Sequence, residues 1–505
     1  MSPKPTVAIL GAGAGGIAMG IALKRAGFEF TIYEKSDGVG GTWRDNAYPG
    51  AACDVPSHLY SYSFELNPWW SRTFASQTEI LAYLERCTDQ YGIRTHLRLG
   101  TAISEARWYP GAQEWVLTAS DGGSFRADVV VSGLGMLNVP RFPAIPGADR
   151  FAGRAFHSSR WDHDKSLSGE RVASIGTGAS AIQYVPAIAP DVEHLTVFQR
   201  TPIWITPRLD KPYSAAEQRR FARVPGAARL HRFGIWRTYQ QASFRADSEQ
   251  TTTMTELARS YLARKVEDPA LREALTPDYP VGCKRPLTSR EWLPALQRPN
   301  VRLVTEPIIE ITARGPRTAD GEVHEVDTII YGTGFSADQY LSTVDVIGEG
   351  GRHLSDDWAE GAEAYMGLSV AGYPNFFLLY GPNTNGVTSI IFLLEAQVHY
   401  VMAALRHMHL MGLASLGVRR RVMTRYNRRV QSRMEGTVWT AGCTNYFRAP
   451  SGKVVTQMPF SGGWYWLHTR IFPIWKYRLG RRVLERQRHR PPNEHALLEG
   501  QRIER

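Results

Sequence analysis

The sequence has few cysteines for its length. Four occur among 505 residues, and they are Cys53, Cys87, Cys283 and Cys443. They form neither a Cys-x-x-Cys pair nor a cluster with the spacing of metal ligands. This distribution predicts no metal site and suits a reducing cytoplasm, where we expect the protein to reside.

Long hydrophobic runs are also lacking. The strongest apolar stretches, residues 376–380 and 390–394, are far shorter than the roughly 20 residues that a membrane span needs. Membrane association is therefore not expected. A secretory signal is not expected either, because the first predicted strand already begins at Thr6.

Positive charge is in excess, and the net charge is +11. Much of the excess lies in two stretches, residues 419–433 and 476–490, where apolar residues such as Trp475, Leu479 and Leu484 interleave with the basic ones. We interpret both stretches as solvated helix faces and the last 30 residues as a partly ordered surface tail. Nucleic acid and an anionic membrane surface are the alternative partners, and neither is expected.

The length exceeds that of one hydrophobic core and predicts two or three domains. Residues 6–34 are expected to form a strand, a glycine-rich turn, a helix and a second strand, and residues 172–200 repeat this order. Between residues 214 and 274 the apolar residues recur at the spacing of a helix, and strand-like segments resume at 301–306 and 325–335. The predicted fold class is α/β, with two Rossmann-like dinucleotide-binding domains and a helical insertion.

The predicted domain boundaries make the first nucleotide domain discontinuous, because the chain is expected to re-enter it after the second. They are 1–142 and 331–505 for the first domain, 143–208 and 284–330 for the second, and 209–283 for the insertion.

The first glycine fingerprint is Gly11-x-Gly13-x-x-Gly16, between a predicted strand and a predicted helix. Its glycines permit a tight turn, the approach of a pyrophosphate and close packing of the helix. Glu34 follows about 20 residues later, at the end of the next strand, where its carboxylate would accept hydrogen bonds from a ribose 2′-hydroxyl. An unphosphorylated ribose, as in FAD or NAD, is expected here. The alternative is a glycine turn without a ligand.

The second fingerprint is Gly176-x-Gly178-x-x-Ala181, and alanine is a known substitute at its third position. No acid stands at the end of the next strand, and Arg200 follows instead. A guanidinium there suits a 2′-phosphate, so NADPH is favoured over NADH. The alternative reading of Arg200 is an ordinary surface arginine.

Three further motifs point to one family. They are GGTWRDNAYPGAACDVPSHLYSYSF at 40–64, the string Phe151-x-Gly153-x-x-x-His157-x-x-x-Trp161-Asp162, and GTGF at 332–335. Together with the fingerprints they resemble class B flavoprotein monooxygenases, and the middle string resembles the signature of type I Baeyer-Villiger monooxygenases. The resemblance implies FAD in the first domain, NADPH in the second, and conversion of ketones to esters or lactones with O2 through a C4a-peroxyflavin.

The resemblance also implies roles for individual residues. The positions that match flavin contacts are Glu34, Thr42, Trp43, Asp54 and Tyr60. The positions that match contacts to NADP are Thr177, Ser180, Arg200, Thr201 and Lys284. Arg285 matches the active-site arginine, and His157 matches a signature histidine near an interdomain linker.

Arg285 is the expected catalytic cation, and Asp54 is expected to orient it through a charge-assisted pair. A fixed cation would stabilise a peroxide anion and the tetrahedral intermediate without donating a proton. The alternative is a salt bridge that only joins domains. Residues 443–447 and 451–453 depart from the pattern of relatives, so substrate preference is not implied by the resemblance.

Two other functions compete with the ketone monooxygenase. One is a flavin monooxygenase that oxidises sulfur or nitrogen, for which the fingerprints would be similar. The other is a non-catalytic flavin-binding protein that uses the fold to bind a partner. The string at 151–162 favours the ketone reaction, and the cluster of Arg200, Lys284 and Arg285 favours a working NADPH site.

Overall fold

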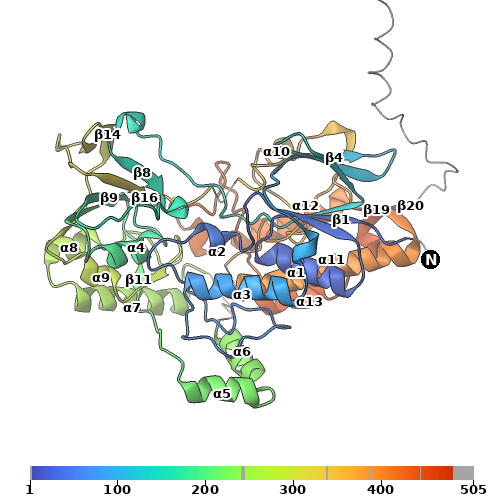
Figure 1. Ribbon diagram of the computed structural model, residues 1–505, viewed down its shortest axis with the longest axis horizontal. Helices are drawn as coiled ribbons and strands as arrows, with labels where there is room; N and C mark the ends of the chain where they lie inside the picture. Colours follow the sequence, from blue (N-terminus) through green and yellow to red (C-terminus); the bar gives the residue numbers. More distant parts are fainter. Residues whose placement is uncertain (1–2, 240–244, 337–338, 387, 444, 482–505) are drawn as a thin grey trace, which may run out of the picture.

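The computed structural model describes residues 3–239, 245–336, 339–386, 388–443 and 445–481. Two α/β lobes lie side by side, each built on a parallel sheet (Figure 1). Thr444 and most of the basic tail, including residues 482–490, lie outside the described residues. Within the described ranges, every helix is too short or too polar to cross a lipid bilayer.

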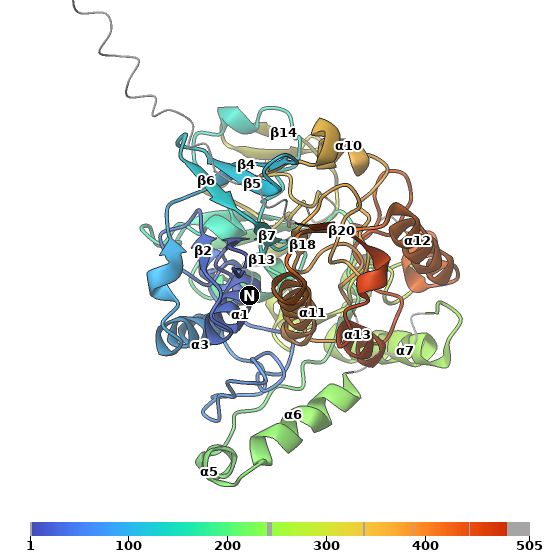
Figure 2. The same cartoon turned by 90° about the vertical axis from the view of Figure 1, so that its right-hand side faces the viewer.

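The first sheet is parallel, with the order β18-β7-β1-β2-β3. Its strands are β1 (Val7–Leu10), β2 (Phe30–Tyr33), β3 (Leu97–Arg98), β7 (Val129–Ser132) and β18 (Phe376–Leu378). Strand β1 is wholly buried, as an apolar run at the centre of a parallel sheet should be. Helix α1 (Ala14–Arg25) packs beside α11 (Ile390–Met411), so distant segments of the chain complete this lobe (Figure 2).

The second sheet is also parallel, with the order β13-β10-β9-β16-β8. Its strands are β8 (Arg154–His157), β9 (Arg171–Ile175), β10 (His194–Phe198), β13 (Val301–Val304) and β16 (Thr328–Tyr331). Helix α4 (Ala181–Ile188) follows β9 after the second glycine turn. Each lobe therefore contains the strand, turn, helix and strand that place a nucleotide at the carboxyl edge of a parallel sheet.

Smaller elements surround the two sheets. One antiparallel meander, β4 (Ile103–Tyr109), β5 (Glu114–Ala119) and β6 (Ser124–Ala127), continues through β17 (Asp345–Ile347). Three strand pairs are β11 (Ile205–Thr206) with β12 (Leu287–Thr288), β14 (Ile308–Thr312) with β15 (Gly315–Thr318), and β19 (Leu413–Val418) with β20 (Tyr477–Arg481). The further helices are α2 (Thr42–Asp45), α3 (Gln77–Gln90), α9 (Trp292–Ala295), α10 (Leu354–Asp357), α12 (Arg420–Met434) and α13 (Gly462–Thr469).

Among the described residues between β11 and β12, four helices occur. They are α5 (Ala215–Arg223), α6 (Ala227–Thr238), α7 (Glu249–Lys265) and α8 (Pro269–Ala274). The pair α5 and α6 extends away from both lobes, whereas α7 and α8 lie against the second lobe (Figure 1). Buried Arg232 of α6 donates to the carbonyl oxygens of His58, Leu59 and Ser61 at 2.7 to 3.0 Å and pairs with Glu395 at 3.3 Å.

The two basic stretches differ in structure. Residues 420–434 form helix α12, as the sequence predicts. The prediction of a helix face at 476–490 is wrong for its described part, because residues 477–481 form strand β20, which pairs antiparallel with β19. Tyr477 explains the strand: its ring is buried, and its hydroxyl bonds with those of Ser369 and Tyr400.

Candidate functional site

A cavity of about 560 Å³ lies between the two lobes. The first lobe contributes the fingerprint residues Gly11 and Gly13 together with Glu34, and the second contributes Gln183 of α4. Arg285, at the end of the helical insertion, also lines it. The volume falls in the range of ligand sites, and one space joins the predicted nucleotide turn to the predicted catalytic cation.

The first fingerprint forms a turn that excludes side chains. Gly11 adopts φ of +95°, which favours glycine. A Cβ at Gly16 would lie 1.9 Å from the carbonyl oxygen of Gly11, so helix α1 approaches the strand too closely for any side chain there. Gly13 is the N-cap residue of α1. The N-terminus of this helix lines the cavity, where its backbone amides suit the negative charge of a pyrophosphate.

Glu34 is held beside this turn. Its side chain is buried, with Oε2 accepting from the Ala12 amide at 2.7 Å and Oε1 from the Ser36 amide at 2.9 Å. Each carboxylate oxygen keeps a further lone pair for a ribose hydroxyl. Among the described residues, the buried Thr388 hydroxyl on the same cavity has no hydrogen-bond partner. The glycine cradle, the carboxylate and this hydroxyl fit a dinucleotide with an unphosphorylated ribose.

The other predicted flavin contacts also line the cavity. Thr42 and Trp43 begin helix α2, and the Trp43 indole donates to the Tyr60 hydroxyl at 2.9 Å. The two rings meet edge to face with centroids 5.6 Å apart. Burial raises the pKa of Tyr60 well above its usual value, so its hydroxyl stays neutral. These side chains form an aromatic wall, and their contact with a flavin stays a prediction.

The second fingerprint has the same geometry with one difference. Gly176 adopts φ of +106°, and a Cβ there would lie 2.6 Å from the carbonyl oxygen of Gly332. The GTGF motif therefore closes over this turn. Ala181 is the first residue of α4 and is fully buried, which shows that a methyl group fits here. Two residues predicted to contact NADP lie between Gly176 and Ala181. Thr177 is buried, and Ser180 stands at the N-cap position of α4.

Two cations lie near each other beyond this turn. Burial lowers the pKa of Lys284, and the charge of Arg200 lowers it further. The two groups are therefore close enough to repel each other electrostatically. Within the described ranges, neither forms an ion pair with a carboxylate within 4.0 Å. Thr201 follows Arg200 directly. Two repelling cations favour an anion between them, as a 2′-phosphate would be.

Arg285 and Asp54 form an ion pair, with 2.5 Å between Nη2 and Oδ2. Both line the cavity, and both side chains are partly exposed to it. The carboxylate of Asp54 raises the pKa of Arg285, which therefore carries a permanent positive charge. Tyr380 and Tyr446 lie in the same electrostatic environment. The predicted catalytic pair is therefore assembled within one space with the first fingerprint.

His157 of the signature string is the last residue of β8. Its ring is buried, with Nε2 bonded to the Gly334 carbonyl at 3.0 Å and Nδ1 to the Ser159 hydroxyl at 2.9 Å. Burial lowers its pKa, although the Gly334 contact acts in the opposite direction. His157 lines no part of the cavity. It joins the signature string to the GTGF motif.

The other signature residues pack the second lobe. A Cβ at Gly153 would lie 2.4 Å from the Asp327 carbonyl oxygen, so glycine is required. Phe151 packs on a cluster around β16, and the Trp161 ring lies 5.5 Å from that of Tyr184. None of the five named residues of the signature string lines the cavity. Their role near an interdomain linker stays a prediction.

Sequence reasoning missed the contacts that join the lobes. Gln183 of α4 donates to the Ala52 carbonyl at 2.9 Å and accepts from the Tyr48 hydroxyl at 3.0 Å. Arg208 donates to the Cys53 carbonyl at 2.8 Å. Neither residue belongs to a pattern that one sequence reveals, because each acts through a partner over 100 positions away.

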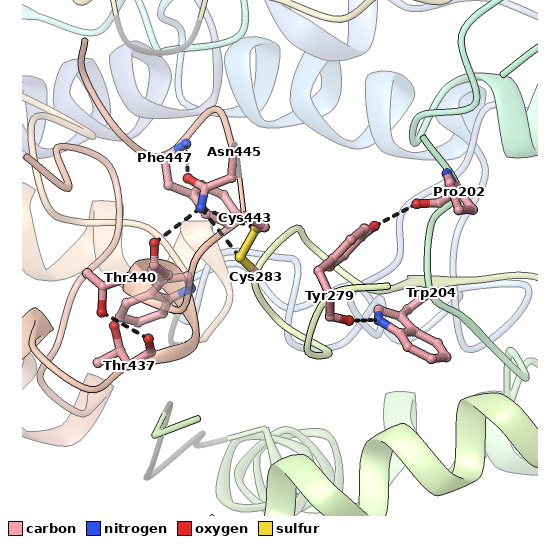
Figure 3. The surroundings of a disulfide bond; sticks show 10 residues. Pro202, Trp204, Tyr279, Cys283, Thr437, Thr440, Cys443, Asn445 and Phe447 are labelled. Carbon is pink, nitrogen blue, oxygen red and sulfur yellow. Dashed lines mark hydrogen bonds between the residues drawn. A yellow bond between two sulfur atoms is a disulfide. The ribbon is translucent and has the colours of Figure 1, made fainter. Parts of the chain in front are cut away.

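A disulfide between Cys283 and Cys443 was also missed (Figure 3). The large sequence separation of these two cysteines gives no indication of their pairing. Cys53 and Cys87 are free and buried. Within the described ranges, no group of acidic, histidine or cysteine side chains is arranged to hold a metal ion.

Comparisons with known proteins agree on one family. A family model described as flavin-binding monooxygenase-like matches residues 4–224. A Baeyer-Villiger monooxygenase of Streptomyces coelicolor is 43% identical over 94% of this chain and 92% of its own length. Another of Pseudomonas aeruginosa is 43% identical over 95% of this chain and 94% of its own.

Solved structures agree with these relatives. OTEMO in complex with FAD and NADP superposes with a TM-score of 0.85 at 29% identity, covering 95% of this chain and 100% of that one. A cyclohexanone monooxygenase from Rhodococcus bound to NADP+ gives a TM-score of 0.86 at 28% identity, with 95% and 100% covered.

These findings confirm the predicted fold class, the family resemblance and the pairing of FAD with NADP. The roles of single residues are a separate matter and stay predictions. By sequence, fold and the composition of its cavity, the chain belongs to the family of FAD- and NADPH-dependent Baeyer-Villiger monooxygenases.

Proposed function

We propose that this chain inserts one oxygen atom of O2 next to a ketone carbonyl and releases an ester or lactone, using FAD and NADPH. The observation that supports this reaction best is the single cavity in which the first glycine turn, Glu34 and the Arg285–Asp54 pair meet. A permanent cation is thereby fixed where a reacting oxygen would carry negative charge.

Two sets of residues would hold the two cofactors. Gly11, Gly13 and Glu34 would hold the pyrophosphate and adenosine ribose of FAD, and Arg200 with Lys284 would hold the 2′-phosphate of NADPH. When bound, the flavin supplies the redox chemistry, accepting a hydride from NADPH and activating O2. Trp43 and Tyr60 would wall the reacting space and exclude water from it.

Arg285 would act by charge alone. Its pKa is raised beside Asp54, so it stabilises an oxyanion on the substrate without giving up a proton. Asp54 is the positioning partner, because its carboxylate fixes the direction of the guanidinium. A cation held by an ion pair needs little reorganisation when negative charge develops.

The strand order supports the discontinuous domains expected from the sequence. Strand β18, at residues 376–378, completes the first sheet, which favours 1–142 and 331–505 as the FAD-binding domain. Strands β8 to β10, β13 and β16 build the second sheet, which favours 143–208 and 284–330 for NADPH. We propose 209–283 as the insertion and the cytoplasm as the location, with a small-molecule ketone substrate and O2 as partners and no nucleic acid.

Product analysis tests the proposal. The purified protein, loaded with FAD and supplied with NADPH, is offered matched panels of ketones and sulfides, and the products are separated by gas chromatography. Esters or lactones from at least one ketone are expected. Sulfoxides or N-oxides without any ester or lactone would assign the chain to heteroatom oxidation. NADPH that fails to reduce the bound flavin would instead indicate a non-catalytic flavin-binding protein.

A further inference from the structure

The Cys283–Cys443 disulfide joins two segments that are 160 positions apart in the sequence. Cys283 is fully buried at the end of the helical insertion, whereas Cys443 is partly exposed in the loop that follows Val438–Thr440. Figure 3 shows the two segments approaching from opposite sides of the bond. The bond is therefore a covalent link between the insertion and the C-terminal part of the chain.

Each side of the bond has hydrogen bonds of its own, and the Asn445 amide also lies 3.8 Å from the Cys283 sulfur. On the Cys283 side, the Trp204 indole donates to the Tyr279 carbonyl and the Tyr279 hydroxyl to the Pro202 carbonyl, both at 2.7 Å (Figure 3). On the Cys443 side, the Asn445 amide donates to the Trp439 carbonyl at 3.2 Å and lies 3.7 Å from the Cys443 sulfur. Breaking the bond would remove the covalent link, while the hydrogen bonds within each segment do not depend on it.

Both segments reach the Arg285–Asp54 pair. Cys283 directly precedes Lys284 and Arg285, and Cys443 stands three positions before Tyr446. Tyr446 is exposed, and its phenol lies within the electrostatic environment of Arg285. The disulfide therefore holds the segment 445–447 next to the group proposed to stabilise the reacting oxygen.

We propose that Cys283 and Cys443 form a reversible redox modification site, which a dithiol reductant opens and a peroxide closes. The effect on catalysis rests on the proposed function. In a reducing cytoplasm, disulfides are usually transient and serve redox sensing or catalysis. The free cysteines would not compete, because burial raises the thiol pKa of Cys53 and that of Cys87, the latter to about 11.

Opening follows ordinary thiol–disulfide exchange. One thiolate of the reductant attacks the sulfur of Cys443, the partly exposed residue of the two, and Cys283 leaves as a thiolate that takes up a proton. The second thiol of the reductant then releases Cys443 as a thiol and becomes disulfide-bonded itself. Two electrons and two protons pass to the protein. Closing consumes one hydrogen peroxide: one thiol becomes a sulfenic acid, the other displaces water from it, and two waters form in total.

Reduction is expected to release residues 445–447 from Arg285. The KM for the ketone should rise about tenfold, because a loosely held segment next to Arg285 would leave this cation less firmly positioned beside the substrate. NADPH-dependent reduction of the flavin should change less, because Lys284 and Arg200 do not depend on Tyr446.

Mass spectrometry of the FAD-loaded full chain tests the bond itself. After treatment with hydrogen peroxide, a peptide that cross-links Cys283 to Cys443 is expected, with only Cys53 and Cys87 alkylated after denaturation. Dithiothreitol should make all four cysteines alkylable and should speed hydrogen exchange of the peptide that contains residues 445–447. Absence of the cross-link, or exchange that does not respond to dithiothreitol, would overturn the proposal whether or not the chain oxidises ketones.

Kinetics test the consequence for catalysis. The wild-type KM for a ketone is compared before and after dithiothreitol, with Cys443→Ser as the permanently open form and Cys87→Ser as the matched control. Cys443→Ser should behave like the reduced protein and ignore dithiothreitol, whereas Cys87→Ser should respond like wild type. A cross-linked protein whose KM does not respond to reduction would overturn the regulatory role while leaving the proposed reaction intact.

Discussion

At the scale of single residues, Arg285 and Arg200 have different surroundings and are proposed to have different roles. Arg285 is fixed by Asp54 inside the cavity, whereas exposed Arg200 stands near Lys284 and binds no carboxylate within the described ranges. An arginine paired with a carboxylate is oriented, and one paired with another cation attracts an anion. The first arrangement suits catalysis and the second suits recognition of a phosphate.

Arg285→Ala is expected to abolish oxygenation while leaving FAD bound and reducible by NADPH. Loss of one electrostatic stabiliser should lower ester formation by about a hundredfold or more, or at least ~2.7 kcal/mol. Product yield and NADPH-driven bleaching of the flavin are measured in parallel. Arg285→Lys is the matched control, because it keeps the charge but loses the guanidinium group that donates to Asp54, and it should retain partial activity. Wild-type ester formation by Arg285→Ala would remove this residue from the mechanism.

Arg200→Ala is expected to raise the KM for NADPH roughly ten- to a hundredfold, which is about 1.4 to 2.7 kcal/mol. The KM for NADH should change little, because NADH has no 2′-phosphate for the guanidinium to bind. Steady-state rates with both nucleotides provide the measurement. Equal losses with NADPH and NADH would show that Arg200 does not read the phosphate.

At the scale of elements, the two glycine turns differ in how closely the helix approaches. A methyl group at Gly16 would meet the Gly11 carbonyl at 1.9 Å, whereas the methyl group of Ala181 already fits at the equivalent position of the second turn. Gly16→Ala should therefore displace α1 and weaken FAD binding, at a cost of about 1 to 3 kcal/mol. Ala181→Gly, the matched control, should bind both cofactors. The measurement is the FAD content of each variant after dialysis. Full retention of FAD by Gly16→Ala would contradict the close approach of α1 to the Gly11 carbonyl.

The helix pair α5 and α6 docks on the segment that carries Tyr60, and a buried histidine lies in that contact. His58 is fully buried beside His231 and Arg232, and neither of its ring nitrogens has a partner among the described residues. Burial lowers its pKa to about 3, with smaller contributions from His231 and Arg232.

This depressed pKa should make stability depend on pH. The unfolded chain protonates His58 near pH 6.5, whereas the folded chain does not until far lower pH. The contribution of neutral His58 to the free energy of unfolding is therefore complete above pH 6.5, and it falls by about 1.4 kcal/mol per pH unit below that pH. Between pH 7 and pH 5, the melting temperature of His58→Phe should fall less than that of the wild type. The melting temperature of His163→Phe, which changes an exposed histidine, should fall as much as that of the wild type. Equal losses in all three proteins would exclude His58 as the cause.

Local sequence rules predicted most of the elements. The fingerprints, Glu34 and Arg200 could be placed because each lies within one strand, turn and helix unit. Contacts between units could not be placed. Gln183, Arg232 and the Cys283–Cys443 bond each join segments more than 100 positions apart, and a single sequence does not indicate such partners. Strand β20 was missed because its pairing with β19 overrides its basic composition.

At the scale of the whole molecule, two parallel sheets face one cavity, and residues from both lobes line it. Arg285 and Asp54 meet there although 231 positions separate them in the sequence. This arrangement explains why the cofactors follow from two fingerprints, whereas the reaction depends on the group that lies between them.

The central claim is that one atom of O2 enters the product beside a ketone carbonyl. Turnover of a ketone with NADPH under 18O2, followed by mass spectrometry, measures this directly. One labelled oxygen per molecule of ester or lactone is predicted, with the second labelled atom recovered in water. Unlabelled ester, or consumption of NADPH and 18O2 without any ester or lactone from the ketone panel, would contradict the account.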